Sequence, residues 1–273
     1  MEIHHQKNEL KIQSRGWTKF QQPTQILNAG NSGTTIRFLS ALLSGSPFNS
    51  TIQGDSSLNL RPMERIIVPL SQMGASIEAH KEEYPPLHIK GASLKGINYH
   101  LPVASAQVKS CLLLAGLMAQ GQTTIEEATS TRNHTELALP FFNTSFTHEN
   151  GRMTISGQSS LTPVQAKIPG DFSAAAFFIL SALLVPNSEI RLVDVGINPS
   201  RTALLDLLEQ AGLHLEKTNL RLSNSEPICD LTIRYTPSLL EKFPTTIQGK
   251  QIPNLIDEIP ILAILGTRLK RGL

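Results

Sequence analysis

NSGTTIRFLSALLSG, residues 31–45, is the stretch that decides the fold of this chain. A polar or glycine-containing start leads into an apolar, helix-like run, and the same order recurs three more times along the chain. The other copies are SAQVKSCLLLAGLMAQG (105–121), GDFSAAAFFILSALLVP (170–186) and DEIPILAILG (257–266). Polar residues ahead of a helix bind its free backbone N–H groups, so each stretch predicts a helix with a polar N-terminus.

A second helix-like segment follows each of the first three starts after about 28 to 30 residues, from Arg61, His134 and Pro199. The short β-type runs TIQG, TTIEE and EIRLVDV lie between the paired segments. Repeats of about 65 to 85 residues are too long for a small solenoid and are typical of βαβ modules packed together. We therefore predict an α/β (α+β) fold of repeated modules, with the polar helix starts facing a common direction and the fourth copy incomplete.

The pattern places the boundaries of these elements as follows. We expect helices at residues 31–44, 61–73, 105–119, 134–143, 171–185 and 199–211. We expect strands at 50–53, 75–79, 87–90, 122–126, 145–148, 153–156, 188–194, 213–217 and 230–234, with a hairpin turn at Asn150 and Gly151. The sharpest candidate boundary between domains lies around Ile168.

Composition narrows the class of protein. The chain has 273 residues, 40% hydrophobic and 17% charged, which is typical of a folded soluble protein with room for two domains. A net charge of +2 and no basic run among aromatics argue against a nucleic acid partner. The N-terminus lacks an apolar signal region, and the longest apolar run, Ala174–Val185, is too short to span a bilayer. We expect a cytoplasmic protein with no membrane partner.

Cysteine and histidine give no sign of a metal site. Cys111 and Cys229 lie far apart without zinc-type spacing, and Cys111 reads as a buried, inert thiol within SCLLLAGL. The eight histidines are scattered along the chain. We expect no metal site.

The helix starts carry the candidate chemistry. In GNSGTT, small residues let a ligand approach the backbone, and the free N–H groups of a helix start bind anions. Ordinary capping by Asn, Ser or Thr explains the same residues. Arg37 and Lys109 are the single charges of their helices and lie near the N-terminal end, where the helix dipole disfavours a cation. Either an anion docks there, or the two side chains extend to solvent.

Further polar residues stand at the corresponding positions of other copies. Arg61, at the start of the second helix of its repeat, offers a forked donor suited to phosphate or carboxylate. Arg132 holds the matching position in the next repeat, and Gln107 adds amide donors. Asp257 opens the fourth apolar run and reads either as a cap or as a general base toward a hydroxyl.

Six segments in this order resemble the family of 3-phosphoshikimate 1-carboxyvinyltransferase, or EPSP synthase. They are GNSGTTIRFLSALLSG, GDSSLNLRPMERIIVPLSQMGA, LPVASAQVKSCLLLAGL, STRNHTE, IPGDFSAAAFFI and LIDEIPILAI. The similarity runs over most of the chain and looks nearest to the bacterial branch. The sister family, UDP-N-acetylglucosamine enolpyruvyl transferase, has a reactive loop cysteine, and neither cysteine here is placed that way.

The resemblance implies an inverse α/β barrel fold of two similar domains, each made of three βαβαββ units whose helix N-termini converge on the interdomain cleft. Residues 1–168 would be the first enolpyruvyl transferase domain without its opening unit, and residues 169–273 a partial second domain. One nearly complete domain would then be followed by part of another.

The resemblance also implies a reaction. Family members transfer the enolpyruvyl group of phosphoenolpyruvate to the 5-hydroxyl of shikimate 3-phosphate through a tetrahedral intermediate. The products are 5-enolpyruvylshikimate 3-phosphate and phosphate, in the shikimate pathway that leads through chorismate to the aromatic amino acids. The reaction uses no metal and no organic cofactor. If this chain behaves as the full-length family does, it is a monomer.

Carried over by motif, the family's ligand contacts fall on the residues already singled out. Phosphoenolpyruvate would be bound by Gly33, Arg61 and Gln107, with Asn31, Thr34 and Arg37 shaping that wall. Shikimate 3-phosphate would be bound by Ser105, Ala106, Gln107, Arg132 and Asp257. Asp257 would also be the catalytic carboxylate, moving protons at the reacting hydroxyl or methyl. Asn133 stands where the family usually has an acid.

The sequence departs from the family at both ends. It has no Asp-Lys-Ser segment with a following Arg, and beyond Asp257 it lacks Lys-Glu-Thr-Asp-Arg, Asp-Asp-His-Arg and a late lysine. We therefore expect a truncated enzyme with little or no turnover alone, because the missing cations would stabilise the phosphate-bearing transition state. The alternative is a non-catalytic fragment that binds shikimate 3-phosphate weakly or not at all and associates through exposed apolar helix faces. A third possibility is a split enzyme completed by a separate chain.

Overall fold

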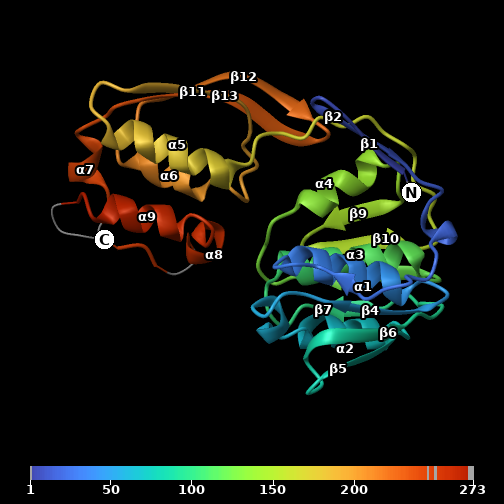
Figure 1. Ribbon diagram of the computed structural model, residues 1–273. Coiled ribbons are helices and arrows are strands. Elements are labelled where there is room, and N and C mark those ends of the chain that lie inside the picture. The colour runs from blue at the N-terminus through green and yellow to red at the C-terminus, as the bar shows by residue number, and fades with distance from the viewer. Residues whose placement is uncertain (1, 245, 249–250, 270–273) are drawn as a thin grey trace. The chain divides into compact units, whose positions relative to one another are not determined.

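The computed structural model describes residues 2–244, 246–248 and 251–269. Met1 and the last four residues of the C-terminal stretch GTRLKRGL lie outside the described residues. Contacts between residues divide the chain into two compact units, and each is described by itself (Figure 1). Unit 1 comprises Met1–Ser130 and Phe142–Pro163, and unit 2 comprises Thr131–Phe141 and Val164–Leu273. The expected domains, 1–168 and 169–273, stay a prediction, because compactness alone does not define a domain.

Unit 1 contains the first repeat and the second repeat except its second helix, α4 (His134–Phe141), which lies in unit 2. The first has the order β3, α1, β4, α2, β5, β6, and its sheet runs β3-β4-β6-β5, with β3 parallel to β4 and the other pairs antiparallel. The second has the order β7, α3, β8, α4, β9, β10, and its sheet runs β7-β8-β10-β9 with the same directions. The bounds are β3 (Leu27–Asn28), α1 (Gly33–Ser44), β4 (Asn49–Gln53), α2 (Glu64–Gln72), β5 (Ser76–His80), β6 (Tyr84–Lys90), β7 (Asn98–His100), α3 (Ala106–Met118), β8 (Gln122–Glu126), α4 (His134–Phe141), β9 (Phe146–Glu149) and β10 (Arg152–Ser156).

The helices of unit 1 pack between its two sheets. Helix α1 lies on β4 and β6, α3 lies on β8 and β10, and α1 and α2 both pack against α3. Helix α3 is therefore covered on all sides, as expected for a helix that is apolar around its whole circumference. Its buried residues are Val108, Lys109, Ser110, Cys111, Leu112, Leu113, Ala115, Gly116 and Leu117. Cys111 is 0% exposed, so its predicted burial is confirmed, and burial raises the pKa of its thiol to about 12.

Unit 2 contains α4 of the second repeat, the third repeat and the start of a fourth. A parallel bridge between Gly170 and Val195 takes the place of the short first strand, and the sheet runs β11-β13-β12. Helix α5 packs on β11 and β13, and α9 packs on α5. The bounds are α5 (Phe172–Leu184), β11 (Glu189–Gly196), α6 (Ala203–Gln210), β12 (Leu215–Ser223), β13 (Glu226–Arg234), α7 (Leu239–Lys242), α8 (Ile252–Leu255) and α9 (Ile259–Gly266).

The predicted repeats and long helices are confirmed, and so is the turn at Asn150 and Gly151. These two residues have φ of 51° and 75°, as a two-residue hairpin turn between twisted strands requires. The sequence did not indicate the short parallel strands β3 and β7. The first two strands, β1 (Glu2–Gln6) and β2 (Glu9–Gln13), pair only with each other and are exposed, and the 3-10 turns are η1 (Trp17–Lys19) and η2 (Leu58–Leu60).

Of the three predicted starts of the second helices, that at His134 is confirmed and the other two were wrong by several residues. Helix α2 begins at Glu64, so Arg61 lies before it with an extended backbone, φ −91° and ψ 128°. The cause is Pro62, whose ring disfavours a helical conformation in the preceding residue. Helix α6 likewise begins at Ala203 instead of Pro199. Within the described ranges, every helix is too short or too polar to cross a membrane.

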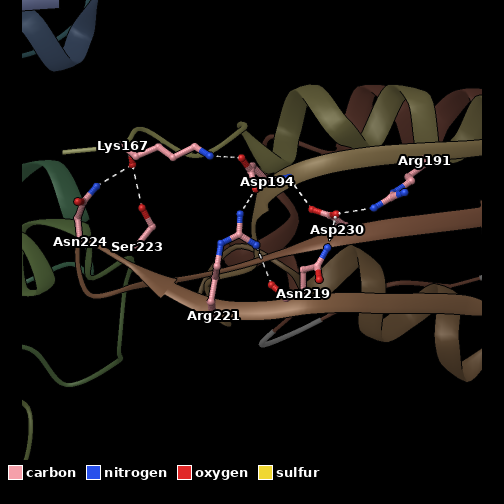
Figure 2. A network of polar contacts seen from close by, with 8 residues as sticks. All are labelled: Lys167, Arg191, Asp194, Asn219, Arg221, Ser223, Asn224 and Asp230. Atoms are coloured by element: carbon pink, nitrogen blue, oxygen red, sulfur yellow. Dashed lines mark hydrogen bonds and ion pairs between the residues drawn. The ribbon is translucent and has the colours of Figure 1, made fainter. Parts of the chain in front are cut away.

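A network of polar contacts braces the sheet of unit 2 (Figure 2). Strand β11 carries a bulge between Leu192 and Val195, and Asp194 in this bulge has φ of 56°. Its backbone N–H donates to Asp230 Oδ1 over 3.0 Å, and its carboxylate accepts from Lys167 and Arg221. Asp230 Oδ2 accepts from Arg191 and Asn219, both at 2.9 Å.

The same network anchors the segment that leads into unit 2. Ser223 and Asn224 donate to the backbone carbonyl of Lys167, while its ammonium reaches the carboxylate of Asp194. Three residues on, Gly170 bonds to the backbone of Asp194 and Gly196. Lys167 to Gly170 are thus tied to the strands of unit 2 by both backbone and side chain.

Candidate functional site

The start of α1 forms the first half of the candidate site in unit 1. Ser32 is the cap, because its side chain accepts the backbone N–H of Thr35 at 3.1 Å. Asn31 lies one residue before this cap, and its side chain is therefore available for other contacts. Gly33 is the first helical residue and is buried. One residue of the motif, Ser32, therefore caps the helix, and the neighbouring residues make other contacts.

The start of α3 meets the start of α1. Ser105 caps α3 by accepting the N–H of Val108 at 3.4 Å, and Ala106 is its first residue. Gln107 joins the two helices. Its Nε2 donates to Thr34 Oγ1 over 3.0 Å, and its Oε1 accepts from Arg37 Nη1 at 2.6 Å. Two helix N-termini of unit 1 therefore converge, as the repeat predicts.

Two guanidinium groups gather at these helix starts. A Cβ added to Gly33 would lie 2.6 Å from Arg37 Nη1 and 3.6 Å from Arg61 Nη1, so both groups pass close to this glycine. The pKa of the Arg37 guanidinium is lowered, first by burial and then by the positive charge of Arg61. Two like charges held together beside free helix N–H groups form a site that an anion would stabilise.

A carboxylate that the sequence did not single out supports this cluster. Asn31 Oδ1 accepts from Arg61 Nη2 at 2.7 Å, and Asn31 Nδ2 donates to Asp55 Oδ2 over 2.7 Å. Asp55 lies in the segment GDSSLNLRPM that was quoted for the resemblance, but nothing in that pattern distinguishes its role. All six residues expected for phosphoenolpyruvate are thus brought into one connected cluster: Asn31, Gly33, Thr34, Arg37, Arg61 and Gln107.

Lys109 does not belong to this cluster, and both readings of it were wrong. Its side chain is 0% exposed, so it does not extend to solvent. Its ammonium bonds at 2.9 Å to Glu127 Oε1, whose side chain is 2% exposed. The anion that explains this cation is a carboxylate of the same chain, which follows β8.

Asp257 is the centre of the candidate site in unit 2. It lies one residue before Glu258, the cap position of α9, and two before Ile259, where the helix begins. Two arginines contact its Oδ2. Arg132 Nη2 donates to it over 2.6 Å, and Arg201 Nη1 lies 3.4 Å away. Arg132 and Asp257, which the sequence expected at one ligand, are therefore direct neighbours.

Arg201 links Asp257 to the start of α5. Its Nη2 donates to Ser173 Oγ over 2.6 Å and lies 3.6 Å from Asp171, whose side chain caps α5. Ser173 in turn donates to Glu258, which is 2% exposed. Sequence reasoning missed Arg201, Ser173 and Glu258. The last two stand inside the quoted segments, whereas Arg201 comes from the turn before α6 and carried no signal.

Three consecutive side chains hold the segment around Arg132 in unit 2. Besides the Arg132 contact, Asn133 Oδ1 accepts from Asn198 at 2.8 Å, and His134 bonds to Glu226. Burial opposes ionisation of Glu226, but hydrogen bonds from His134 and Asn198 outweigh it, so the pKa of Glu226 is lowered. Asn133, which stands where the family usually has an acid, keeps an acceptor oxygen for Asn198.

Among the residues that the structure describes, no group of three or more His, Cys, Asp or Glu is placed to hold a metal ion. The chemistry visible in the two units is of another kind. Unit 1 offers cations and helix N–H groups for an anion, and unit 2 offers a carboxylate between two arginines.

Comparison with known proteins gives the family. A family model described as EPSP synthase (3-phosphoshikimate 1-carboxyvinyltransferase) matches residues 1–270. Proteins of that name from Solibacter usitatus and Brevibacillus brevis are 45% and 42% identical to this chain over 100% and 99% of its length. A solved EPSP synthase from Acinetobacter baumannii superposes with a TM-score of 0.83 at 40% identity over 97% of this chain.

The chain spans 63% of the length of those two relatives and 60% of the length of the solved chain. Over 97% of this chain the fold matches that of the solved relative. The chain therefore belongs to the EPSP synthase (3-phosphoshikimate 1-carboxyvinyltransferase) family.

Proposed function

We propose that this chain binds phosphoenolpyruvate and shikimate 3-phosphate and takes part in enolpyruvyl transfer between them. The observation that carries the proposal is the cluster of Arg37 and Arg61 over Gly33, next to the converging starts of α1 and α3. Cations, free N–H groups and a glycine at one place are what a small, multiply charged anion requires.

Phosphoenolpyruvate suits the cluster in unit 1 for a simple electrostatic reason. Its phosphate and carboxylate would replace the repulsion between Arg37 and Arg61 with two attractive contacts. Gln107 bonds to Arg37 through its carbonyl and keeps an amide group directed at Thr34. A bound anion would thus find charged donors already oriented, which lowers the entropic cost of binding.

Each unit by itself offers groups that suit shikimate 3-phosphate: Ser105, Ala106 and Gln107 in unit 1, and Arg132 and Asp257 in unit 2. The backbone N–H groups at the start of α3 and the forked guanidinium of Arg132 are both suited to phosphate. Arg132 is held in place by its contact with Asp257 and by the anchored neighbours Asn133 and His134.

Asp257 is the residue we propose for proton transfer. In the reaction a proton adds to C3 of phosphoenolpyruvate while the 5-hydroxyl oxygen attacks C2 and loses its own proton. The tetrahedral intermediate then expels phosphate and gives up a proton from the C3 methyl. A carboxylate at the reacting atoms can accept the hydroxyl or methyl proton, and Arg132 and Arg201 fix its orientation.

The direct test is phosphate release by the purified chain from both substrates together. The proposal expects release that requires both substrates and is abolished in Asp257→Asn, with Glu241→Gln as a control acid elsewhere in unit 2. No release above background, together with no binding of either substrate, would refute the proposal.

The second candidate is binding without turnover, favoured by the intact cluster in unit 1. Calorimetric titration separates the two. Phosphoenolpyruvate should bind to the chain, and Arg61→Ala should weaken the affinity about tenfold or more, as the loss of a charged donor predicts. Binding with no phosphate release would establish the second candidate over the first.

A further inference from the structure

Asp55 is fixed beside the anion cluster by contacts to two loops of unit 1. Its backbone N–H donates to the carbonyl of Gly30 over 2.8 Å, and its Oδ1 accepts the N–H of Leu58 at 2.8 Å. Its other oxygen, Oδ2, accepts from Asn31 Nδ2 at 2.7 Å. The pKa of Asp55 is lowered, first by the Leu58 N–H and then by Asn31, so the group is a carboxylate at neutral pH.

A carboxylate next to an amide decides which way the amide points. An ionised Asp can only accept hydrogen bonds, so the NH2 group of Asn31 must face Asp55. The carbonyl oxygen of Asn31 then faces the other way, and it accepts from Arg61 Nη2 at 2.7 Å. A guanidinium can only donate, so Arg61 needs an oxygen at this place. The three groups form a chain with one possible direction.

We propose that Asp55 is a positioning residue of the anion site, which sets the orientation of the Arg61 guanidinium through the side-chain amide of Asn31. The part of this inference that concerns the ligand rests on the proposed function of unit 1. Asp55 itself contacts no ligand group, and it acts only through Asn31. All three side chains are exposed, so water competes for the contacts and the effect is modest.

The direction in which the affinity for an anion changes distinguishes a positioning role of Asp55 from an effect of its charge alone. Removing a negative charge beside two arginines should tighten the binding of an anion if charge alone matters. In Asp55→Asn, the oxygen of the new amide can still serve the Leu58 N–H, so its NH2 faces Asn31. The Asn31 amide then inverts and turns a donor toward Arg61. We expect phosphoenolpyruvate to bind about threefold to tenfold more weakly to this variant.

Two further variants complete the comparison. Asp55→Ala leaves the Asn31 amide free to keep its oxygen toward Arg61, so its loss of affinity should be smaller than that of Asp55→Asn. A purely structural role predicts the reverse order, since alanine also removes the acceptor for Leu58. Glu64→Gln, which removes an exposed charge at the start of α2, should bind phosphoenolpyruvate as tightly as the unchanged chain or more tightly.

A readout without ligand keeps this inference separate from the proposed function. In the side-chain amide region of the ¹H–¹⁵N NMR spectrum, the signals of Asn31 should shift between the unchanged chain and Asp55→Asn. Asn59 is the internal reference, because its side chain bonds only to the backbone of Gly54 in the contacts resolved, at 2.8 and 3.0 Å. Its signals should stay in place.

The outcomes divide as follows. Unshifted Asn31 signals, or Asp55→Asn binding as tightly as the unchanged chain, overturn the role of Asp55. Failure of the unchanged chain to bind phosphoenolpyruvate overturns the proposed function instead, and shifted Asn31 signals then still establish that Asp55 orients Asn31.

Discussion

At the scale of single residues, three cations of unit 1 that look alike in sequence have different roles. Lys109 is fully buried and bonded to Glu127, Arg37 is half-buried and bonded to Gln107, and Arg61 is exposed and bonded to Asn31. The first is paired inside the protein with a full negative charge. The other two contact neutral amides and repel each other, and this is why they, and not Lys109, suit an incoming anion.

Gly33→Ala tests the close approach of the two guanidinium groups. The new methyl group would lie 2.6 Å from Arg37 Nη1, and the flexible end of that side chain must move. We expect several-fold weaker binding of phosphoenolpyruvate by calorimetry, with an unchanged or slightly raised melting temperature, because alanine favours helix more than glycine does. A lower melting temperature with unchanged affinity would contradict this reading.

The buried pair of Lys109 and Glu127 predicts strong coupling. Lys109→Met leaves the Glu127 carboxylate buried without this partner, and the free energy of unfolding should fall by about 3 to 5 kcal/mol. The double variant with Glu127→Met should lose less than the sum of the two single variants. Urea denaturation of all four proteins measures the difference, and simple additivity would show that the two groups are not coupled.

At the scale of elements, the sheet of unit 2 shows how charge compensates for an irregular strand. The bulge in β11 turns Asp194 into a conformation that non-glycine residues seldom adopt. Its backbone N–H and the side chains of Arg191 and Asn219 all point at Asp230 (Figure 2). These hydrogen bonds lower the pKa of Asp230 to about 2, and the one from the Asp194 N–H has the largest effect.

The stabilisation by Asp230 should depend on pH in a defined way. The folded pKa of about 2 lies below 3.8, the ordinary pKa of an aspartic acid side chain, so the contribution is complete above pH 3.8 and is lost as the pH falls toward 2. Asp230→Asn should melt a few degrees below the unchanged chain at pH 7, and the gap should close in that acid range.

Thermal melts across that range, followed by circular dichroism, check this expectation. Glu189→Gln is the control, since Glu189 lies on β11 of the same sheet in an exposed pair with Arg234 and should have little effect. A difference in melting temperature between Asp230→Asn and the unchanged chain that stays constant down to pH 2 would mean that the charge of Asp230 does not contribute to stability.

At the scale of the whole molecule, each compact unit has a core of its own. In unit 2, residues of α5, α6, β13 and α9 form one continuous apolar cluster. In unit 1, α1, α2 and α3 bury their apolar residues between two sheets. Separate cores predict that the units open separately, since cooperative unfolding follows shared burial.

Matched core substitutions test this independence. Ile179 in α5 and Ile36 in α1 are both 0% exposed, and truncation of either to alanine should cost about 2 to 5 kcal/mol. By hydrogen exchange and mass spectrometry, Ile179→Ala should lose protection in unit 2 only, and Ile36→Ala in unit 1 only. Equal loss of protection in both units from one substitution would show a single cooperative core.

Much of the fold could be predicted from local patterns. Short stretches of sequence predict the helix starts with polar caps and the turn at Asn150 and Gly151. They also predict the succession of helices and longer strands along each repeat. The strands β3 and β7 could not be predicted, because a strand of two or three residues has no periodicity and exists only through its neighbour. The extended backbone at Arg61 could have been predicted from Pro62.

The sequence by itself determined the repeats, the family and the residues that carry charge at each helix start. Only the tertiary structure decided what those charges do. It pairs Lys109 with Glu127, sets Asp257 between Arg132 and Arg201, and links Asp55 to Arg61 through Asn31. The physical reason is that an ion pair or a hydrogen bond depends on distance and direction between groups far apart in the chain, and no local pattern records these.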